Sequence, residues 1–270
     1  MSCSSAYRLL DVGGTFIKCA DGRQVPVCSD GSREEIAAAL KEAIGPTGGL
    51  KGVGIAIPGP FDFEKGIFLM KHKFSAVYGL SFRELTQLQE HIVLKFHHDV
   101  NVLLRGAVRM LGLEKDNAAL VTLGTGLGFT YSIRGQVQYN ESGSPARNLW
   151  NIPLEGGGIL EDRLSARGIR EAYVRLTGDD TLSVHAIARR AYGGEDAALE
   201  VFSNLGCQLG EALEGPVQEL KIDTLLVGGQ IAKSLSLMLR PLQNRLEGIR
   251  IQPVPEGAVF EGLSILFENE

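Results

Sequence analysis

Glycine-rich turns that follow strand-like segments recur along this chain, and they constrain the fold more than any other feature. The turns are Asp11-Val12-Gly13-Gly14-Thr15, Leu123-Gly124-Thr125-Gly126-Leu127-Gly128 and Val227-Gly228-Gly229-Gln230-Ile231. An acidic segment, Asp99-Val100-Asn101, lies between the first two turns. Because glycine has no Cβ, its backbone N–H groups can approach a phosphate closely. The ordered set predicts a nucleotide clamped between two related domains, and therefore a phosphotransferase.

The first glycine turn lies within a predicted β-meander. Residues 7–11 and 16–20 are strand-like on either side of it, Asp21-Gly22 is a hairpin signal, and residues 24–28 can return as a third strand. A dinucleotide-binding Rossmann turn would instead lead from a strand into a helix. The pattern therefore argues against a Rossmann site, and the sequence contains no Walker A motif.

The same pattern restarts near the middle of the chain. Residues 118–123 and 129–133 are strand-like and flank the second glycine turn. We interpret this as an internal structural duplication. It predicts an N-terminal α/β domain over residues 1–115 and a C-terminal α/β domain over residues 116–270, whose tail can pack back on the first domain.

Helix signals fill the rest of both halves. Capping boxes begin at Ser32 and Ser81, and the second predicts a helix through about Glu90. An apolar run over residues 51–57 predicts a central strand buried on both faces. The other expected elements are strands at 92–96 and 222–227, helices at 100–111, 159–174, 183–191, 195–213 and 231–246 (bent at Pro241), and an irregular segment at 138–158. Residues 258–267 are compatible with short strands or with a final helix.

Composition sets mild bounds on function. The net charge is −5 and no Lys/Arg block is present, so nucleic-acid and membrane partners are not expected. The cysteines, at positions 3, 19, 28 and 207, have no metal-ligand or redox spacing. The N-terminus shows no signal-peptide pattern and no apolar run is long enough to span a bilayer. These features predict a cytoplasmic protein with reduced thiols.

Two aspartates are the candidates for the chemistry. Asp11, beside the first glycine turn, can hold Mg²⁺ through water, because Mg²⁺ gives up its hydration shell reluctantly. Asp99, at the end of a predicted strand, can accept the proton of an acceptor hydroxyl. Structural roles remain open for both residues: Asp11 can cap a turn, and Asp99 can cap the following helix.

The ordered motifs resemble the ROK family (repressor, open reading frame, kinase) of sugar kinases, within the superfamily of hexokinase, actin and Hsp70. Residues 11–15 are similar to its first phosphate motif, residues 52–59 to its G-V-G-x-x-x-P-G strand, and His98-Asp99-Val100-Asn101 to N-D-A-N, whose Asp is the catalytic base. Residues 124–128 resemble the second phosphate motif and Gly228-Gly229 the adenosine motif. The resemblance implies two ribonuclease-H-like (actin-like ATPase) domains with a central cleft, ATP and Mg²⁺ as cofactors, a hexose or N-acetylhexosamine acceptor, and a homodimer. The nucleotide-binding residues that it implies are Asp11, Gly13, Gly14, Thr15, Gly124, Thr125, Gly126, Gly228 and Gly229.

The acceptor region departs from the family pattern. Asn148 stands where a sugar-binding Glu is expected, Asn151 where a zinc-binding His is expected, and the cysteines of the zinc loop are absent, so no zinc is expected. Glu161 keeps the position of a sugar-contacting Glu, and Lys73 replaces a sugar-binding Asn. The resulting set of candidate acceptor residues is Lys73, His98, Asn101, Asn148, Asn151 and Glu161. Because charge and hydrogen-bonding polarity have changed, we expect an acceptor preference that is not simply for glucose.

Three other functions compete with the sugar kinase. A sugar-responsive repressor would carry a DNA-binding domain before the first phosphate motif, where about ten residues precede Asp11. A catalytically weak sugar or nucleotide sensor would explain the altered acceptor residues but not the retained Asp11 and Asp99. A kinase acting on a non-sugar hydroxyl or carboxylate remains open.

Overall fold

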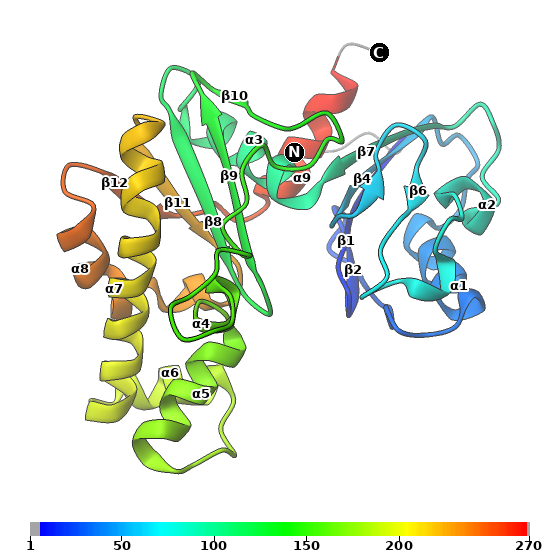
Figure 1. The fold of residues 1–270 in the computed structure, drawn as a ribbon. Helices are drawn as coiled ribbons and strands as arrows, with labels where there is room; N and C mark the ends of the chain where they lie inside the picture. The colour runs from blue at the N-terminus through cyan, green and yellow to red at the C-terminus, as the bar shows by residue number, and fades with distance from the viewer. Residues whose placement is uncertain (1–5, 269–270) are drawn as a thin grey trace. The chain divides into compact units, whose positions relative to one another are not determined.

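The computed structural model describes residues 6–268, which form two compact units (Figure 1). Unit 1 comprises Met1–Gly112, Gln138–Ala146 and Pro255–Glu270, and unit 2 comprises Leu113–Val137 and Arg147–Val254. The change of unit at Gly112 lies near the expected boundary at residue 115. Segments 138–146 and 255–270, which lie beyond the expected boundary in the sequence, belong to unit 1.

Unit 1 is built on a five-stranded sheet in the order β3-β2-β1-β4-β7. Its strands are β1 (Tyr7–Val12), β2 (Phe16–Cys19), β3 (Gln24–Pro26), β4 (Gly52–Ile57) and β7 (Val93–His98). β1, β2 and β3 form an antiparallel meander, whereas β4 and β7 add to β1 in parallel. All six residues of β4 are buried, as the apolar run predicted. A separate pair, β5 (Phe61–Asp62) and β6 (Ile67–Phe68), forms a small antiparallel sheet.

Helices and their caps complete unit 1. Ser32 caps α1 (Arg33–Ile44) with the expected capping box, since its side chain accepts from Glu35 N and Glu35 bonds back to Ser32 N. α3 (Asp99–Leu111) begins directly after β7 and ends at Gly112. The tail forms α9 (Ala258–Ser264) followed by the 3₁₀ turn η3 (Ile265–Phe267), which decides between the two alternatives that the sequence left open.

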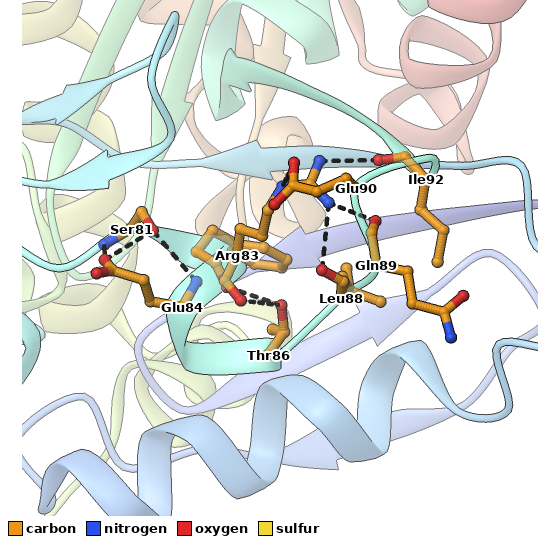
Figure 2. Close-up of polar contacts among 9 residues, drawn as sticks. Ser81, Arg83, Glu84, Thr86, Leu88, Gln89, Glu90 and Ile92 are labelled. Carbon is orange, nitrogen blue, oxygen red and sulfur yellow. Dashed lines mark hydrogen bonds and ion pairs between the residues drawn. The ribbon is translucent and has the colours of Figure 1, made fainter.

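α2 is shorter than the sequence predicted. It spans Phe82–Thr86 and ends where Gln87 takes a left-handed conformation, so the expected continuation to Glu90 is wrong. The Arg83 guanidinium explains the early stop, because it donates to the carbonyl oxygens of Leu88, Gln89 and Ile92 (Figure 2). These bonds satisfy carbonyl groups in a non-helical segment that leads directly into β7.

α3 and α9 pack against each other in unit 1 at very short range. A Cβ on Gly106 would lie 1.8 Å from the Ala258 carbonyl oxygen, and one on Gly262 would lie 2.0 Å from the Val102 carbonyl oxygen. Glycine therefore lets the two backbones touch. Beside this contact, Leu263 and Phe267 join residues of β1, β4 and α3 in a common core, whose other members are Leu9, Ala56 and Val102.

Unit 2 repeats the sheet of unit 1 in the order β10-β9-β8-β11-β12. Its strands are β8 (Ala118–Leu123), β9 (Leu127–Ile133), β10 (Gln136–Val137), β11 (Thr224–Gly228) and β12 (Arg250–Pro253). Again an antiparallel meander is extended by two parallel strands. The shared order confirms the internal duplication inferred from the two glycine turns, each of which joins the first two strands of its sheet.

The helices of unit 2 pack on this sheet through a core that includes Phe202, Leu209 and Met238. The expected helix at 159–174 is two helices, α4 (Leu160–Arg163) and α5 (Ala166–Thr177), separated by Leu164 and Ser165. The remaining helical elements are α6 (Val184–Tyr192), α7 (Asp196–Glu219), η2 (Ile231–Ser234) and α8 (Leu235–Arg245). α7 runs six residues beyond the expected end and contains Pro216.

Within residues 6–268, no helix has the length and apolar character required to cross a bilayer. Cys19, Cys28 and Cys207 are free thiols, and Cys3 lies outside the described residues.

Candidate active site

The first glycine turn connects β1 to β2 and is held from two sides. The N–H of Gly13 donates to the carbonyl oxygen of Phe16 at 3.0 Å, which closes the turn. The N–H of Ser29 donates to the carbonyl oxygen of Gly14 at 3.1 Å, and the N–H of Val27 to that of Thr15 at 2.9 Å. The turn is therefore fixed before any ligand binds, while Thr15 itself is exposed.

Asp11 lies one residue before this turn and is paired with Lys18. The two residues are directly opposite in the β1–β2 ladder, and Lys18 Nζ lies 3.4 Å from Asp11 Oδ2. Burial raises the pKa of Asp11 above its ordinary value of 3.8; the charge of Lys18 opposes this rise and the Asp99 carboxylate adds to it. Asp11 and Asp99 are thus close enough to repel each other within unit 1.

Asp99 is the first residue of α3, at the carboxyl end of β7. Its Oδ1 accepts a hydrogen bond from Val100 N at 2.8 Å and lies 2.8 Å from His98 Nδ1. Burial alone would raise the pKa of Asp99, but His98, the Val100 N–H and the charge of Lys73 outweigh it, so the pKa falls below 3.8. The carboxylate is ionised at neutral pH and about one-third exposed, at 36%.

Other expected acceptor residues of unit 1 differ in their surroundings. His98 packs against the Phe63 ring, with 5.9 Å between ring centroids. Asn101 is buried, and its Nδ2 donates to the Gly143 carbonyl oxygen at 3.2 Å, so it ties α3 to the 138–146 segment. Lys73 lies alongside Gly14. The structure therefore brings Asp11, Lys73, His98 and Asp99 together near the first glycine turn, whereas Asn101 binds the 138–146 segment.

The second glycine turn, in unit 2, is bound by Glu161. Its Oε2 accepts from Leu127 N at 2.8 Å, and a Cβ on Gly126 would lie 2.6 Å from the same oxygen. The Gly124 N–H donates to the Gly126 carbonyl oxygen at 3.1 Å, and the Gly124 carbonyl oxygen accepts from Ala166 N at 2.8 Å. Glu161, expected to contact a sugar, here supports the turn that the sequence assigned to phosphate binding.

The third glycine turn packs on the second. Gly228 ends β11, and Gly229 follows with φ +85°, where a Cβ would lie 2.2 Å from the Leu123 carbonyl oxygen. The structure therefore brings Gly229 next to Leu123, the residue before Gly124. In the same unit, Asn148 and Asn151 are exposed and flank the buried Leu149.

A cavity of about 640 Å³ adjoins the second turn and contains residues that the sequence did not single out. Thr125 and one face of α5 line it, including Arg167 and Arg170. Arg167 pairs with Asp162, and Arg170 donates to the Asp180 carbonyl oxygen at 3.3 Å. The spacing of these arginines on a predicted helix was the available signal, but such a pattern is also typical of a solvated helix face.

His97, the residue before His98, gives the site a pH-dependent stability. Burial lowers the pKa of His97 from 6.5 to about 4, with help from the charges of Arg105 and Lys95. Above pH 6.5 neither the folded nor the unfolded chain protonates this residue; between pH 6.5 and 4 only the unfolded chain does. We expect this to cost up to about 3 kcal/mol of stability at pH 4.

Thermal unfolding at pH 7 and pH 4.5 tests this expectation. His97→Gln should lose less stability between the two pH values than the original protein does. The control is His91→Gln, because His91 is exposed in the same unit. Equal pH dependence in His97→Gln and the original protein would contradict the assignment.

The raised pKa of Asp11 makes a second prediction, on stability without ligands. A carboxyl whose pKa is raised on folding disfavours the folded state at neutral pH, and this cost disappears as the pH falls below its pKa. Asp11→Asn should therefore raise the unfolding temperature of the ligand-free protein, where each kcal/mol corresponds to roughly 2–4 °C.

Lys18→Met should have the opposite effect on stability to Asp11→Asn, because it removes the charge that stabilises the Asp11 carboxylate. It should lower the unfolding temperature, by a small amount because Lys18 is 48% exposed. Calorimetry at pH 7 measures both variants. A lower unfolding temperature for Asp11→Asn would show that the Asp11 carboxylate stabilises the folded protein, and it would contradict the prediction.

The fold can now be compared with known proteins. No family model matches the chain. A glucokinase of Halalkalibacterium halodurans is 24% identical over 300 aligned positions, which cover 94% of this chain and 89% of that protein. A ROK family glucokinase from Streptomyces griseus, solved in complex with glucose and AMPPNP, has a TM-score of 0.78 at 20% identity, and the match covers 97% of this chain and 98% of that one. The chain has the fold of the ROK family.

The ROK fold also occurs in a protein of a different kind. A ROK family transcriptional regulator, a homologue of the Escherichia coli MLC protein, has a TM-score of 0.70 at 16% identity, with 97% of this chain and 81% of that chain covered. The α/β fold and the resemblance to the ROK family are therefore confirmed. Since one fold serves kinases and regulators, the activity must be argued from the site residues.

Proposed function

We propose that this chain is an ATP-dependent kinase that phosphorylates a hydroxyl group of a sugar, of the hexose or N-acetylhexosamine class. The observation that carries the proposal is the ionised Asp99 carboxylate, held at the end of β7 in the same unit as the first glycine turn. A regulator needs no base at this position. The glucokinase similarity over nearly the whole chain supports the same activity.

The glycine turns are the proposed nucleotide-binding elements. Backbone N–H groups of the turns at Gly13-Gly14 and Gly124-Thr125-Gly126 would bind phosphate oxygens, and Gly228-Gly229 would let the adenosine approach the backbone. Thr15 and Thr125 can add hydroxyl donors. Both turns are already fixed by internal hydrogen bonds, so little ordering is required when the nucleotide binds.

Asp11 is the residue proposed to hold Mg²⁺. Within residues 6–268, no group of three or more His, Cys, Asp or Glu side chains is arranged to hold a metal ion. One carboxylate beside a phosphate turn nevertheless fits Mg²⁺, which usually takes one or two carboxylates together with phosphates and waters. The exposed Lys18 can give way to it. When bound, the ion would neutralise phosphate charge.

Asp99 is the proposed general base. Because its pKa is lowered, it is ionised and able to accept the acceptor proton at neutral pH. Phosphoryl transfer requires chiefly positioning and charge stabilisation, so a weak base that accepts the proton late in the step is sufficient. The Val100 N–H holds the carboxylate in place during this transfer, with His98 Nδ1 2.8 Å away.

The acceptor is proposed to differ from plain glucose. His98 is a basic group in unit 1, and Asn148 and Asn151 are neutral amides in unit 2. We also propose a homodimer acting in the cytoplasm, without nucleic-acid or membrane partners.

The test is ADP release with Mg·ATP across a panel of hexoses, N-acetylhexosamines and sugar alcohols, with the phosphorylated product identified by mass spectrometry. We expect turnover with one acceptor class, and better turnover with that class than with glucose. Nucleotide binding without turnover of any acceptor would contradict the kinase and favour a sensor. The sensor is the second candidate because a transcriptional regulator has the same fold. Turnover only of a non-sugar hydroxyl or carboxylate would contradict the sugar class.

A further inference from the structure

Lys73 lies along the first glycine turn. Its Cδ and Cε atoms are each 3.8 Å from the position that a Cβ on Gly14 would occupy. A Cβ at Gly14 would therefore be in ordinary van der Waals contact with the hydrocarbon part of the Lys73 side chain, which lies beside the turn.

The backbone that carries Lys73 is fixed to the same turn. Phe74 is fully buried, takes a left-handed conformation with φ 53°, and packs against Phe68 with 5.7 Å between ring centroids. Its N–H donates to the Ser29 carbonyl oxygen at 2.7 Å, and the Ser29 N–H donates to the Gly14 carbonyl oxygen at 3.1 Å. Two hydrogen bonds thus connect the backbone next to Lys73 to the turn beside which its side chain lies.

The Lys73 ammonium has no hydrogen bond or ion pair within residues 6–268. Neighbouring lysines do: Lys18 pairs with Asp11, and Lys95 donates to the Leu266 carbonyl oxygen at 2.6 Å. The charge of Lys73 nevertheless reaches Asp99 and favours its ionised form. Among the described residues, a cation without an ion pair therefore lies within electrostatic range of the proposed base and beside the proposed phosphate turn.

We propose that Lys73 is a catalytic residue that binds the transferring phosphoryl group of the nucleotide. This inference rests on the proposed kinase function. In the step, the bond between the γ-phosphorus and the β,γ-bridging oxygen breaks, and a bond forms between that phosphorus and the acceptor oxygen. The acceptor proton goes to Asp99, ADP leaves with the bridging electron pair, and Lys73 stays protonated throughout.

Charge favours the phosphoryl group over the acceptor as the partner of Lys73. Negative charge is spread over the equatorial oxygens of the transferring group, whereas a sugar hydroxyl is neutral. A lysine ammonium acts as a compact point charge that suits phosphate oxygens. Pre-positioned donors of this kind are worth roughly 10²–10³-fold in kcat when one is removed from an active site.

Nucleotide binding to the full-length protein, measured by calorimetry with ADP and with the non-hydrolysable triphosphate AMPPNP, separates the roles. Lys73→Met should weaken AMPPNP binding by about 10-fold or more and leave ADP binding unchanged, which also shows that the variant is folded. Lys73→Arg should recover part of the loss. Lys71→Met is the matched control, because the Lys71 ammonium instead lies 5.3 Å from the centroid of the Tyr78 ring.

Turnover of the acceptor found in the panel completes the test. Lys73→Met should lower kcat by about 10²-fold with little change in the acceptor KM. Equal effects on ADP and AMPPNP, or a raised acceptor KM with kcat intact, would overturn the proposal and leave the kinase function standing. If the original protein bound neither nucleotide, the kinase function and this inference would both be wrong.

Discussion

Replacing Asp99 by Asn should lower kcat for phosphoryl transfer by about 10²–10⁴-fold, the usual contribution of a general base. The change preserves shape, and the Asn oxygen can still accept the hydrogen bond from Val100 N that Asp99 accepts at 2.8 Å. What it removes is the negative charge beside His98 and the ability to take a proton. The KM values for ATP and for the acceptor should change little, because the interaction lost belongs to the transition state.

Steady-state kinetics with the best acceptor of the panel measure this effect. The control is Asp62→Asn, because Asp62 lies in the same unit and, among residues 6–268, its side chain accepts from the turn N–H groups of Glu64 and Lys65 alone. If Asp99→Asn kept a tenth or more of the original kcat, Asp99 would not be the general base. Asp99 would then be a residue that starts α3, which is the structural alternative considered from the sequence.

Replacing Gly229 by Ala should disrupt the packing of the two glycine turns in unit 2. Gly229 has φ +85°, and an added Cβ would lie 2.2 Å from the Leu123 carbonyl oxygen, a backbone atom that no side-chain rotation can move away. The left-handed conformation and the steric overlap together should cost roughly 2–5 kcal/mol. Relief would require the second glycine turn to shift, so nucleotide affinity should fall as well.

Gly248→Ala separates the two causes. Gly248 lies in unit 2 with a similar φ of +80°, but a Cβ there would meet no atom within 4 Å. It should cost about 1–2 kcal/mol for the conformation alone and leave nucleotide binding intact. Urea unfolding and ADP calorimetry on both variants make the comparison. If the two variants lost the same stability and had the same ADP affinity, the contact between the turns at Gly229 and Leu123 would contribute to neither stability nor nucleotide binding.

Predictions from the sequence were confirmed where a short local pattern determines a helix cap, a strand or a turn. The Ser32 capping box, the buried β4 and the two strand–glycine turn–strand repeats are all present in the structure. Predictions failed where tertiary contacts outweigh local pattern. α2 ends early because Arg83 binds carbonyl groups of the following segment. β12 was missed because its four residues, which include a proline, form a strand only by pairing with β11.

The candidate site shows the same limit. Residue types and spacing singled out Asp11, Asp99 and the glycine turns as candidates, since the chemistry of these residue types is readable from the chain. Sequence position alone could not show that Glu161 binds Leu127 N, that Asn101 binds the Gly143 carbonyl oxygen, or that Lys73 covers Gly14. These are contacts between distant segments, 34 and 42 residues apart for the first two.

The packing of α9 in unit 1 has a consequence for biosynthesis. Leu263 and Phe267 complete a core whose other members, Leu9, Ala56 and Val102, are made first. At roughly 5–20 residues per second, a ribosome needs about 8–30 s to add the intervening 150 or so residues. Unit 2, whose residues end at Val254, has all of its chain available earlier. Unit 1 therefore cannot complete this core until all of unit 2 has been synthesised, and a nascent chain stalled before α9 would lack Leu263 and Phe267.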